Sequence, residues 1–239
     1  MKLFKIPFDD SDSAPDKIAD ELKEQGLNEE GFFPVFDAEE IKKEDIEEKF
    51  LFALDQTDKV VSVSGNHLIS SLLINSFSKR YRNCGIIIFD AHPDCENEND
   101  LLPSIIRHNV RNGNIILIGT RSWKKNELGF LKNNKIRFFE MRKMIEFGNM
   151  DVIETIMETA RHFEALYVSI DLDVLDPCFA PAVNSYEPGG LSSRDLLFFL
   201  SRLKKLQNLK AIDITELNPE KDINNLTAKL AAKLIVELC

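Results

Sequence analysis

The sequence lacks the features that mark membrane, exported and thiolate-metal proteins. Its longest stretch without a charged residue, 60–78, contains six serines, two asparagines, a glycine and a histidine, so it is too polar to span a bilayer. The opening segment MKLFKIPFDD turns acidic before an apolar signal-peptide core can develop. The four cysteines, Cys84, Cys95, Cys178 and Cys239, form no CxxC pair and favour reduced thiols. These absences predict a cytoplasmic protein that binds no membrane.

Basic residues are also in deficit. The chain of 239 residues has 30 Lys and Arg against 40 Asp and Glu, which gives a formal net charge of −10. This balance argues against nucleic acid as a main partner, since nucleic-acid binding needs a basic surface. The sequence contains no linker, low-complexity tract or internal repeat, so residues 1–239 are predicted to form a single domain.

Short apolar runs rich in β-forming residues recur along the whole chain. They occupy residues 2–6, 32–36, 60–64, 86–89, 115–118, 136–139, 166–170 and 211–214. The runs IIIF and IILI are continuous rather than alternating, which is typical of strands covered on both faces. The run at 32–36 contains Pro34, which cannot donate to a strand ladder and indicates a sheet edge. The acidic stretch that follows, 37–48, is predicted to be a solvated helix face or loop.

Segments with helical periodicity separate several of these runs. Leucines and other apolar residues recur on one face within 152–163, 196–203 and 226–238. Ser192 and Ser193 precede the second of these segments as candidate helix caps. The alternation of strand and helix predicts an α/β fold in which a mainly parallel sheet lies between helix layers.

Acidic residues and histidines collect directly after four of the predicted strands. Ligands of open α/β sheets bind beyond the carboxyl ends of the strands. These ends read Gly65-Asn66-His67, Asp90-Ala91-His92-Pro93-Asp94, Asp171-Leu172-Asp173 and, after AIDIT, Glu216. A lone DxD or DxH is common in turns and caps, but two such motifs at strand ends together indicate a site.

The spacing of these residues suggests how they bind metal. Asp90, His92 and Asp94 lie at i, i+2 and i+4, so an extended backbone would point all three the same way. Several carboxylates cannot converge in a dry crevice without a counter-charge, which two divalent cations would supply. The mixed oxygen and nitrogen donors suit Mn²⁺, and a shared carboxylate would let two ions share a bridging hydroxide. The predicted metal ligands are His67, Asp90, His92, Asp94, Asp171 and Asp173.

These segments also carry a family resemblance. GIIIFDAHPDCEN resembles the DAHxD segment of the ureohydrolases, the family of arginase, agmatinase and formimidoylglutamase. SIDLDVLDPCFAPAVNSYEPGGLSSRDL, DITELNP, SGNH and IPFDD resemble further segments of that family in the same order. The resemblance implies a three-layer α/β/α fold with an eight-stranded parallel sheet, two Mn²⁺ ions per chain and a homo-trimer or hexamer.

The resemblance also implies individual roles. One manganese would be held by His67, Asp90, Asp94 and Asp171, and the other by Asp90, His92, Asp171 and Asp173, with Asp90 and Asp171 bridging. Glu216 would grip the guanidinium of the substrate, because a carboxylate pairs with two N–H groups of a planar cation. Asp213 is expected to be structural. Asn184 lies in a loop, 184–187, that either selects substrate or makes the turn before Gly189.

Two departures from the family pattern concern activity. Asn66 stands where the family has an acid, which is expected to retune the site. The family's HG motif, whose histidine moves protons, has no counterpart in 99–106. His108 is interpreted as a helix-surface histidine, with a proton shuttle as the alternative, and His162 as a surface residue.

The leading hypothesis is therefore a binuclear manganese hydrolase that cleaves a C–N bond of a linear amidine or guanidine. A second hypothesis is a catalytically silent family member that keeps the metal site for structure or ligand binding. A third is deacetylase-like chemistry with a single zinc, which the complete second ligand set disfavours.

Overall fold

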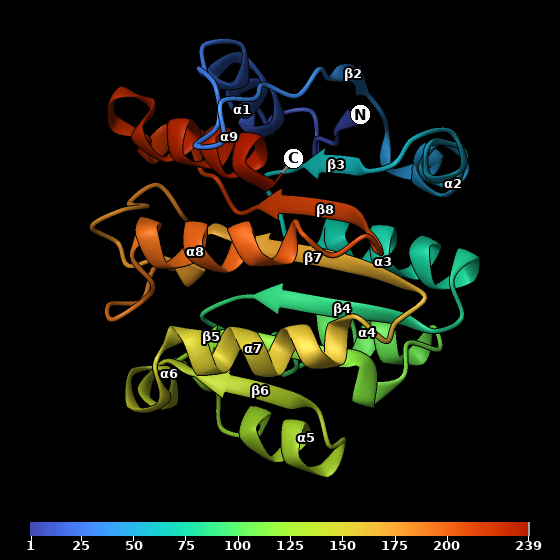
Figure 1. Cartoon of the computed structure of the whole chain (residues 1–239), viewed down its shortest axis with the longest axis vertical. Helices are drawn as coiled ribbons and strands as arrows, with labels where there is room; N and C mark the ends of the chain where they lie inside the picture. Colours follow the sequence, from blue (N-terminus) through green and yellow to red (C-terminus); the bar gives the residue numbers. More distant parts are fainter. Residues whose placement is uncertain (239) are drawn as a thin grey trace.

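Eight parallel strands form one sheet in the computed structural model, which describes residues 1–238 (Figure 1). The strands are β1 (Lys2–Lys5), β2 (Asp37–Glu40), β3 (Val60–Val63), β4 (Cys84–Phe89), β5 (Ile115–Thr120), β6 (Arg137–Glu140), β7 (Ala165–Asp171) and β8 (Leu209–Thr215). Their order across the sheet is β2-β1-β3-β8-β7-β4-β5-β6, and every neighbouring pair is parallel. The predicted eight-stranded α/β fold is confirmed.

Helices cover both faces of this sheet and make the three layers. The helices are α1 (Ala14–Lys23), α2 (Ile46–Gln56), α3 (Leu68–Arg80), α4 (Leu101–Arg107), α5 (Glu127–Asn133), α6 (Met141–Phe147), α7 (Asn149–Ala160), α8 (Ser193–Leu203) and α9 (Leu226–Leu238). Buried side chains of α1, α6, α7, α8 and α9 form one core cluster with the sheet. Those of α2, α3, α4 and α5 form the other, on the opposite face (Figure 1).

The continuous apolar strands follow from this double covering. In β4, Ile87 and Phe89 belong to one core cluster, whereas Ile86 and Ile88 belong to the other. Because successive side chains of a strand point to opposite faces, a strand with a helix layer on each side needs apolar residues at every position. This is why IIIF and IILI show no alternation.

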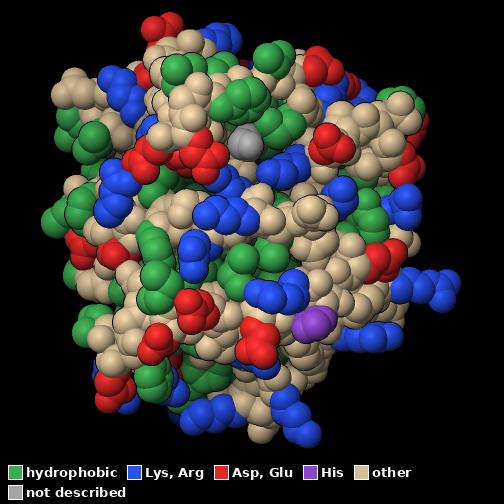
Figure 2. All heavy atoms as spheres, viewed as in Figure 1, with side chains coloured by type: hydrophobic (Ala, Val, Ile, Leu, Met, Phe, Trp, Pro, Cys, Tyr) green, Lys and Arg blue, Asp and Glu red, His purple; other side chains and the backbone are tan. Residues whose placement is uncertain are grey.

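The periodic segments form helices as predicted. They become α7, α8 and α9, whose buried apolar residues belong to one core cluster, although Leu226 at the start of α9 is exposed. Ser192 caps α8 in a reciprocal arrangement: its Oγ accepts from the Asp195 amide at 3.0 Å, and Asp195 Oδ2 accepts from the Ser192 amide at 3.1 Å. On the face made by α7 and α8, acidic and basic side chains are interspersed (Figure 2).

The prediction of a strand at 32–36 is wrong. The edge strand is β2, at Asp37–Glu40, within the acidic stretch that was expected to be helix or loop. Pro34 removes an amide that a ladder would need, so pairing with β1 begins only after it. Lys2 offsets the negative charge of this edge strand, because its Nζ lies 2.9 Å from Asp37 and 2.7 Å from Glu39. Charge on an edge strand also discourages pairing with other chains.

Two further findings concern membrane-spanning helices and the cysteine thiols. Among the helices of residues 1–238, none has the length and hydropathy needed to cross a membrane. Cys84, Cys95 and Cys178 are free thiols. Cys239 lies outside the described residues.

Candidate metal centre

The candidate centre lies where four neighbouring strands end. β3, β8, β7 and β4 are consecutive in the sheet, so their carboxyl ends lie side by side. A cavity of about 270 Å³ opens there. Its wall consists of His67, Leu68, His92, Asp94, Asp100, Lys124, Glu127, Asp171, Asp173, Ser185 and Glu216. The strand order therefore brings together residues that are up to 149 positions apart in the sequence.

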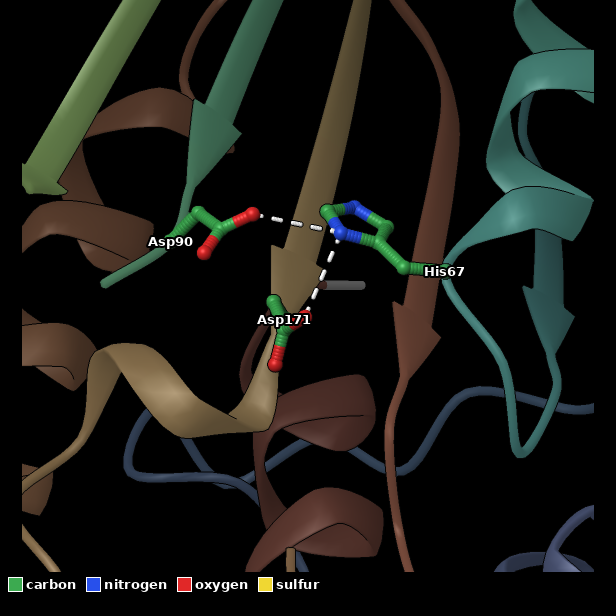
Figure 3. Close-up of side chains that lie close together, drawn as sticks. All are labelled: His67, Asp90 and Asp171. Carbon is green, nitrogen blue, oxygen red and sulfur yellow. Dashed lines mark ion pairs between the residues drawn. The ribbon is translucent and has the colours of Figure 1, made fainter. Parts of the chain in front are cut away.

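A first ligand cluster surrounds His67 (Figure 3). Its Nδ1 lies 3.2 Å from Asp90 Oδ2, 3.2 Å from Asp171 Oδ2 and 3.4 Å from Asp94 Oδ2. His67, Asp90 and Asp171 are buried, and their ligand atoms lie within 4.8 Å of one another. The three come from the loop after β3, the end of β4 and the end of β7.

A second cluster shares Asp90 with the first. It contains Asp90, His92 and Asp173, again with ligand atoms within 4.8 Å of one another. His92 Nδ1 lies 2.8 Å from Asp173 Oδ2 and 3.8 Å from Asp90 Oδ1. Because the two oxygens of Asp90 face different clusters, this carboxylate is placed to bridge two ions. Asp171, the other bridge implied by the resemblance, belongs only to the first cluster.

Turns, not extended backbone, aim the carboxylates into the cavity. β4 ends at Phe89, and a short 3-10 helix follows Asp171, so the expectation of extended spacing is wrong. Asp90 Oδ1 accepts from the His92 amide at 2.6 Å, and Asp171 Oδ1 accepts from the Asp173 amide at 2.8 Å. In such turns the carboxylate accepts a hydrogen bond from the amide two residues later. That amide is then not available to the strand ladder, so the strand ends. Asp94 adopts a left-handed φ of 48°, a strain typical of functional positions.

A chain of hydrogen bonds fixes the orientation of the His67 ring. Its Nε2 lies 3.1 Å from Ser169 Oγ, which donates at 2.7 Å to Asp213 Oδ1. The Tyr167 hydroxyl donates to the other oxygen of Asp213. Since the Ser169 proton is committed to Asp213, Ser169 accepts from His67, and Nε2 carries the ring proton. Asp213 is thus structural, as expected, whereas Ser169 and Tyr167 were not recognised from the sequence.

The other ring nitrogen of His67, Nδ1, indicates whether the site can hold a metal ion. Nδ1 of His67 is buried and has no hydrogen-bond partner among residues 1–238, yet three carboxylate oxygens converge on it. A lone pair facing three carboxylates is stable only with a cation between them. Without a metal a proton takes that place: burial lowers the pKa of His67, but contacts with Asp171, Asp90 and Asp94 raise it well above its usual value. The donor set therefore fits a divalent ion.

The pKa shifts of the carboxylates and of His92 also fit a site for divalent ions. Burial, followed by the nearby charge of Asp173, raises the pKa of both Asp90 and Asp171 well above the usual range. For His92, burial lowers the pKa, but the Asp173 contact outweighs it and raises the pKa to about 9. The site as folded is short of positive charge, and bound divalent ions would supply it.

Glu216 projects into the cavity from the end of β8. Its backbone has a left-handed φ of 70°, and its Oε1 accepts from the His67 amide at 2.8 Å. Burial raises the pKa of Glu216. Within the described chain Oε2 makes no hydrogen bond, so it is available to a ligand.

Arg121 is a residue of the site that sequence reasoning missed. Its guanidinium donates to the main-chain oxygens of Gly119, Asp173, Val174, Leu175, Glu187 and Pro188. It thus fastens the loop after β7, and a Cβ at Gly190 would lie only 2.6 Å from its Nη2. That loop places Glu187 Oε1 3.0 Å from Ser122 Oγ and 3.7 Å from His92 Nε2. No spacing pattern signals this role, because all the acceptors are backbone atoms.

Two other residues considered from the sequence lie away from the cavity wall. His108 is exposed at the end of α4, not inside a helix, and lines a different hollow with Lys79 and Arg111. Asn184 is exposed, and its Oδ1 accepts from Asn218 Nδ2 at 2.7 Å. Its neighbour Ser185 contributes to the cavity wall instead.

The family model and the similar sequences both point to one family. The model of the arginase family matches residues 10–239. The arginase of Staphylococcus aureus (strain COL) is 31% identical over 196 residues, with coverage of 72% of this chain and 65% of that protein. The agmatinase of Bacillus subtilis (strain 168) is 29% identical over 203 residues, with coverage of 81% and 67%. The matched part thus spans less than two-thirds of the S. aureus protein.

Solved structures show the same fold. The arginase from Bacillus cereus superimposes with a TM-score of 0.85 at 21% identity, covering 100% of this chain and 98% of that one. The formimidoylglutamase from Bacillus subtilis subsp. subtilis str. 168 has a TM-score of 0.90 at 22% identity, covering 99% and 85%.

Proposed function

The chain belongs to the arginase family, and from that premise we propose that it is a binuclear manganese hydrolase that cleaves a C–N bond of a linear amidine or guanidine. The observation that carries this proposal is the pair of ligand clusters joined by Asp90. At the centre of one lies the buried Nδ1 of His67, which has no hydrogen-bond partner among residues 1–238. The ions would be held by His67, Asp90, His92, Asp94, Asp171 and Asp173.

Divalent ions held there would lower the pKa of a water molecule and make hydroxide available near neutral pH. The chain's own residues would do the rest. Glu216 would hold the cationic carbon centre in place, since its Oε2 is free to pair with N–H groups of a planar cation. Its Oε1 bond to the His67 amide fixes the position of that carboxylate relative to the ligand cluster.

The same proposal has consequences for the whole molecule. Residues 1–239 would form a single cytoplasmic domain that assembles into a homo-trimer or hexamer and binds neither nucleic acid nor membrane. Light scattering of the purified protein would test the assembly, and a monomer at micromolar concentration would contradict it.

The decisive experiment couples metal analysis to product release on one sample. The protein is loaded with Mn²⁺, its metal content is measured by elemental analysis, and urea or amine release is assayed on arginine, agmatine, guanidinobutyrate and formimidoylglutamate. Two manganese ions per chain with turnover would support the proposal. Two ions without turnover on any substrate would favour a silent metal-binding member, and one zinc per chain would favour deacetylase-like chemistry.

A further inference from the structure

A second hollow, of about 590 Å³, lies at the amino end of the sheet. β4 and β5 are neighbouring parallel strands, so the loops that lead into them, 81–83 and 108–114, lie side by side at that end. These loops and the end of α3 supply the residues that line the hollow, which are Ser78, Lys79, Arg82, His108, Asn109 and Arg111. The lining thus contains three basic residues and a histidine but no acid, in a chain whose net charge is −10.

Two of the cations in this hollow have no partner within the described chain. Among residues 1–238, the guanidinium groups of Arg82 and Arg111 make no hydrogen bond or ion pair, and both residues are exposed. Lys79 is paired, since its Nζ lies 2.6 Å from Glu47 Oε2. His108 Nδ1 donates to a carbonyl oxygen of α4 at 2.8 Å, so a neutral His108 ring offers no N–H to the hollow. The two arginines are therefore the charged donors that remain for a ligand.

The acids next to these segments are engaged elsewhere. Asp55 Oδ1 accepts from Arg80 Nε at 3.0 Å, and Glu164 Oε2 accepts from the Asn83 amide at 3.4 Å. Neither acid lines the hollow. The charge of the two arginines is thus left for a dissolved anion to neutralise.

The helix ends explain only part of this positive charge. Basic residues are favoured in the last turn of a helix, because they interact with the partial negative charge there. Lys79 has this position in α3, which ends at Arg80. Arg82 and Arg111 lie in the loops beyond the ends of α3 and α4, so helix dipoles do not account for them.

Hydrogen bonds join the two loops that carry the arginines. The Asn114 side-chain amide donates to Asn83 Oδ1 at 3.2 Å and to the Cys84 carbonyl oxygen at 2.9 Å. Arg82 and Arg111 therefore extend from segments that are fixed to one another before any ligand binds. Donors held in this way lose less conformational entropy on binding than donors on separate mobile loops.

The lining also restricts the class of ligand. All six lining residues are polar or charged, so the hollow offers little to an apolar group. A guanidinium pairs with two oxygens of a phosphate or carboxylate, so two arginines match an anion with at least two such groups. A long polyanion such as nucleic acid is disfavoured by the net charge of −10.

We propose that this hollow binds a compact polyanion with two or more phosphate or carboxylate groups, held by Arg82 and Arg111. The six residues of β4 separate this end of the sheet from the metal centre by about 20 Å. The anion is therefore not a substrate of that centre, and its binding does not depend on the proposed hydrolase activity.

Calorimetric titration of the full-length protein with pyrophosphate, citrate and orthophosphate tests the proposal. The protein is first freed of metal, so that no anion binds through a metal ion. Pyrophosphate or citrate is expected to bind at least about 10-fold more tightly than orthophosphate, because a second charge-assisted contact is made. The tighter of the two identifies the ligand as a phosphate or a carboxylate compound. If neither bound more tightly than orthophosphate, the proposal would be overturned.

Variants locate the binding site. Arg82→Gln and Arg111→Gln should each weaken binding of the preferred anion roughly 10-fold, whereas Arg82→Lys, which keeps the charge but loses the fork, should weaken it less. Arg142→Gln is the matched control, because Arg142 is an exposed arginine of α6 that does not line the hollow. An equal loss in Arg142→Gln, or no loss in either variant of the hollow, would refute the assignment. Circular dichroism checks that the variants fold, and if one does not, the wild-type anion series still decides.

Discussion

The four histidines of the chain divide into two pairs at opposite ends of the sheet. His67 and His92 follow the carboxyl ends of β3 and β4 and stand among aspartates. His108 and His162 lie near the amino ends of β5 and β7 and are exposed. The same side chain is a candidate ligand at one end and a solvated surface group at the other.

Burial and neighbours produce this difference. Around His67 three carboxylate oxygens lie within 3.4 Å of Nδ1, and His67, Asp90 and Asp171 are buried. At the amino end, charges pair on the surface, as Lys79 does with Glu47 at 2.6 Å with both side chains more than half exposed. Solvent screens such pairs, so they can contribute little to binding or stability.

The largest effect is expected from removing the central ligand. His67→Ala should weaken Mn²⁺ binding by more than about 100-fold, since even the loss of an outer partner of a ligand costs 10–100-fold. Calorimetric titration of the metal-free protein with Mn²⁺ measures this. His162→Ala is the control from the other pair and should bind as the wild type does. If the two variants bound Mn²⁺ equally, the contrast between the ends would be refuted.

A smaller effect is expected from the hydrogen-bond chain behind His67. Ser169→Ala removes the acceptor that holds the Nε2 proton, so the ring loses its fixed orientation and Mn²⁺ affinity should fall roughly 10–100-fold. Ser62→Ala is a matched control, because Ser62 is a buried serine on β3 whose Oγ has no partner in residues 1–238. An unchanged affinity in Ser169→Ala would show that packing alone orients the ring.

The buried acid in that chain should appear in the pH dependence of stability. Burial raises the pKa of Asp213 above its value in the unfolded chain. The folded state therefore binds this proton more tightly, and its contribution to stability is lost as pH rises through the folded pKa. Asp213→Asn removes that loss. The free energy of unfolding of this variant should therefore rise relative to that of the wild type as pH increases from 4.5 to 8.

Urea unfolding of the metal-free proteins across this range provides the measurement. Asp20→Asn serves as the control of opposite sign, because Lys23 lowers the pKa of this exposed acid. For this pair, the free energy of unfolding of the wild type should rise relative to that of Asp20→Asn as pH increases. A difference between wild type and Asp213→Asn that did not change with pH would contradict the assignment.

The smallest effect is expected at the amino end. Lys79→Met should change the free energy of unfolding by about 1 kcal/mol or less, since exposed ion pairs contribute 0.2–1 kcal/mol. The change should shrink further in 1 M salt, where screening is stronger. A loss that salt does not reduce would show that this end is less solvated than its exposure indicates.

Much of the fold was readable from local patterns. Seven of the eight expected strands appear in the sheet, because a strand buried on both faces needs an unbroken apolar run. The eighth was misplaced since charge, not hydrophobicity, marks the edge strand β2. The aspartates and histidines of the centre were visible because they follow those runs directly.

The sequence by itself determined which residues stand at the strand ends and hence the chemistry available there. Only the tertiary structure decided that β3, β8, β7 and β4 are neighbours, that turns aim Asp90 and Asp171 inward, and that Arg121 fastens the loop after β7. Periodicity depends on residues a few positions apart, whereas strand order and backbone acceptors depend on packing between segments far apart in the chain.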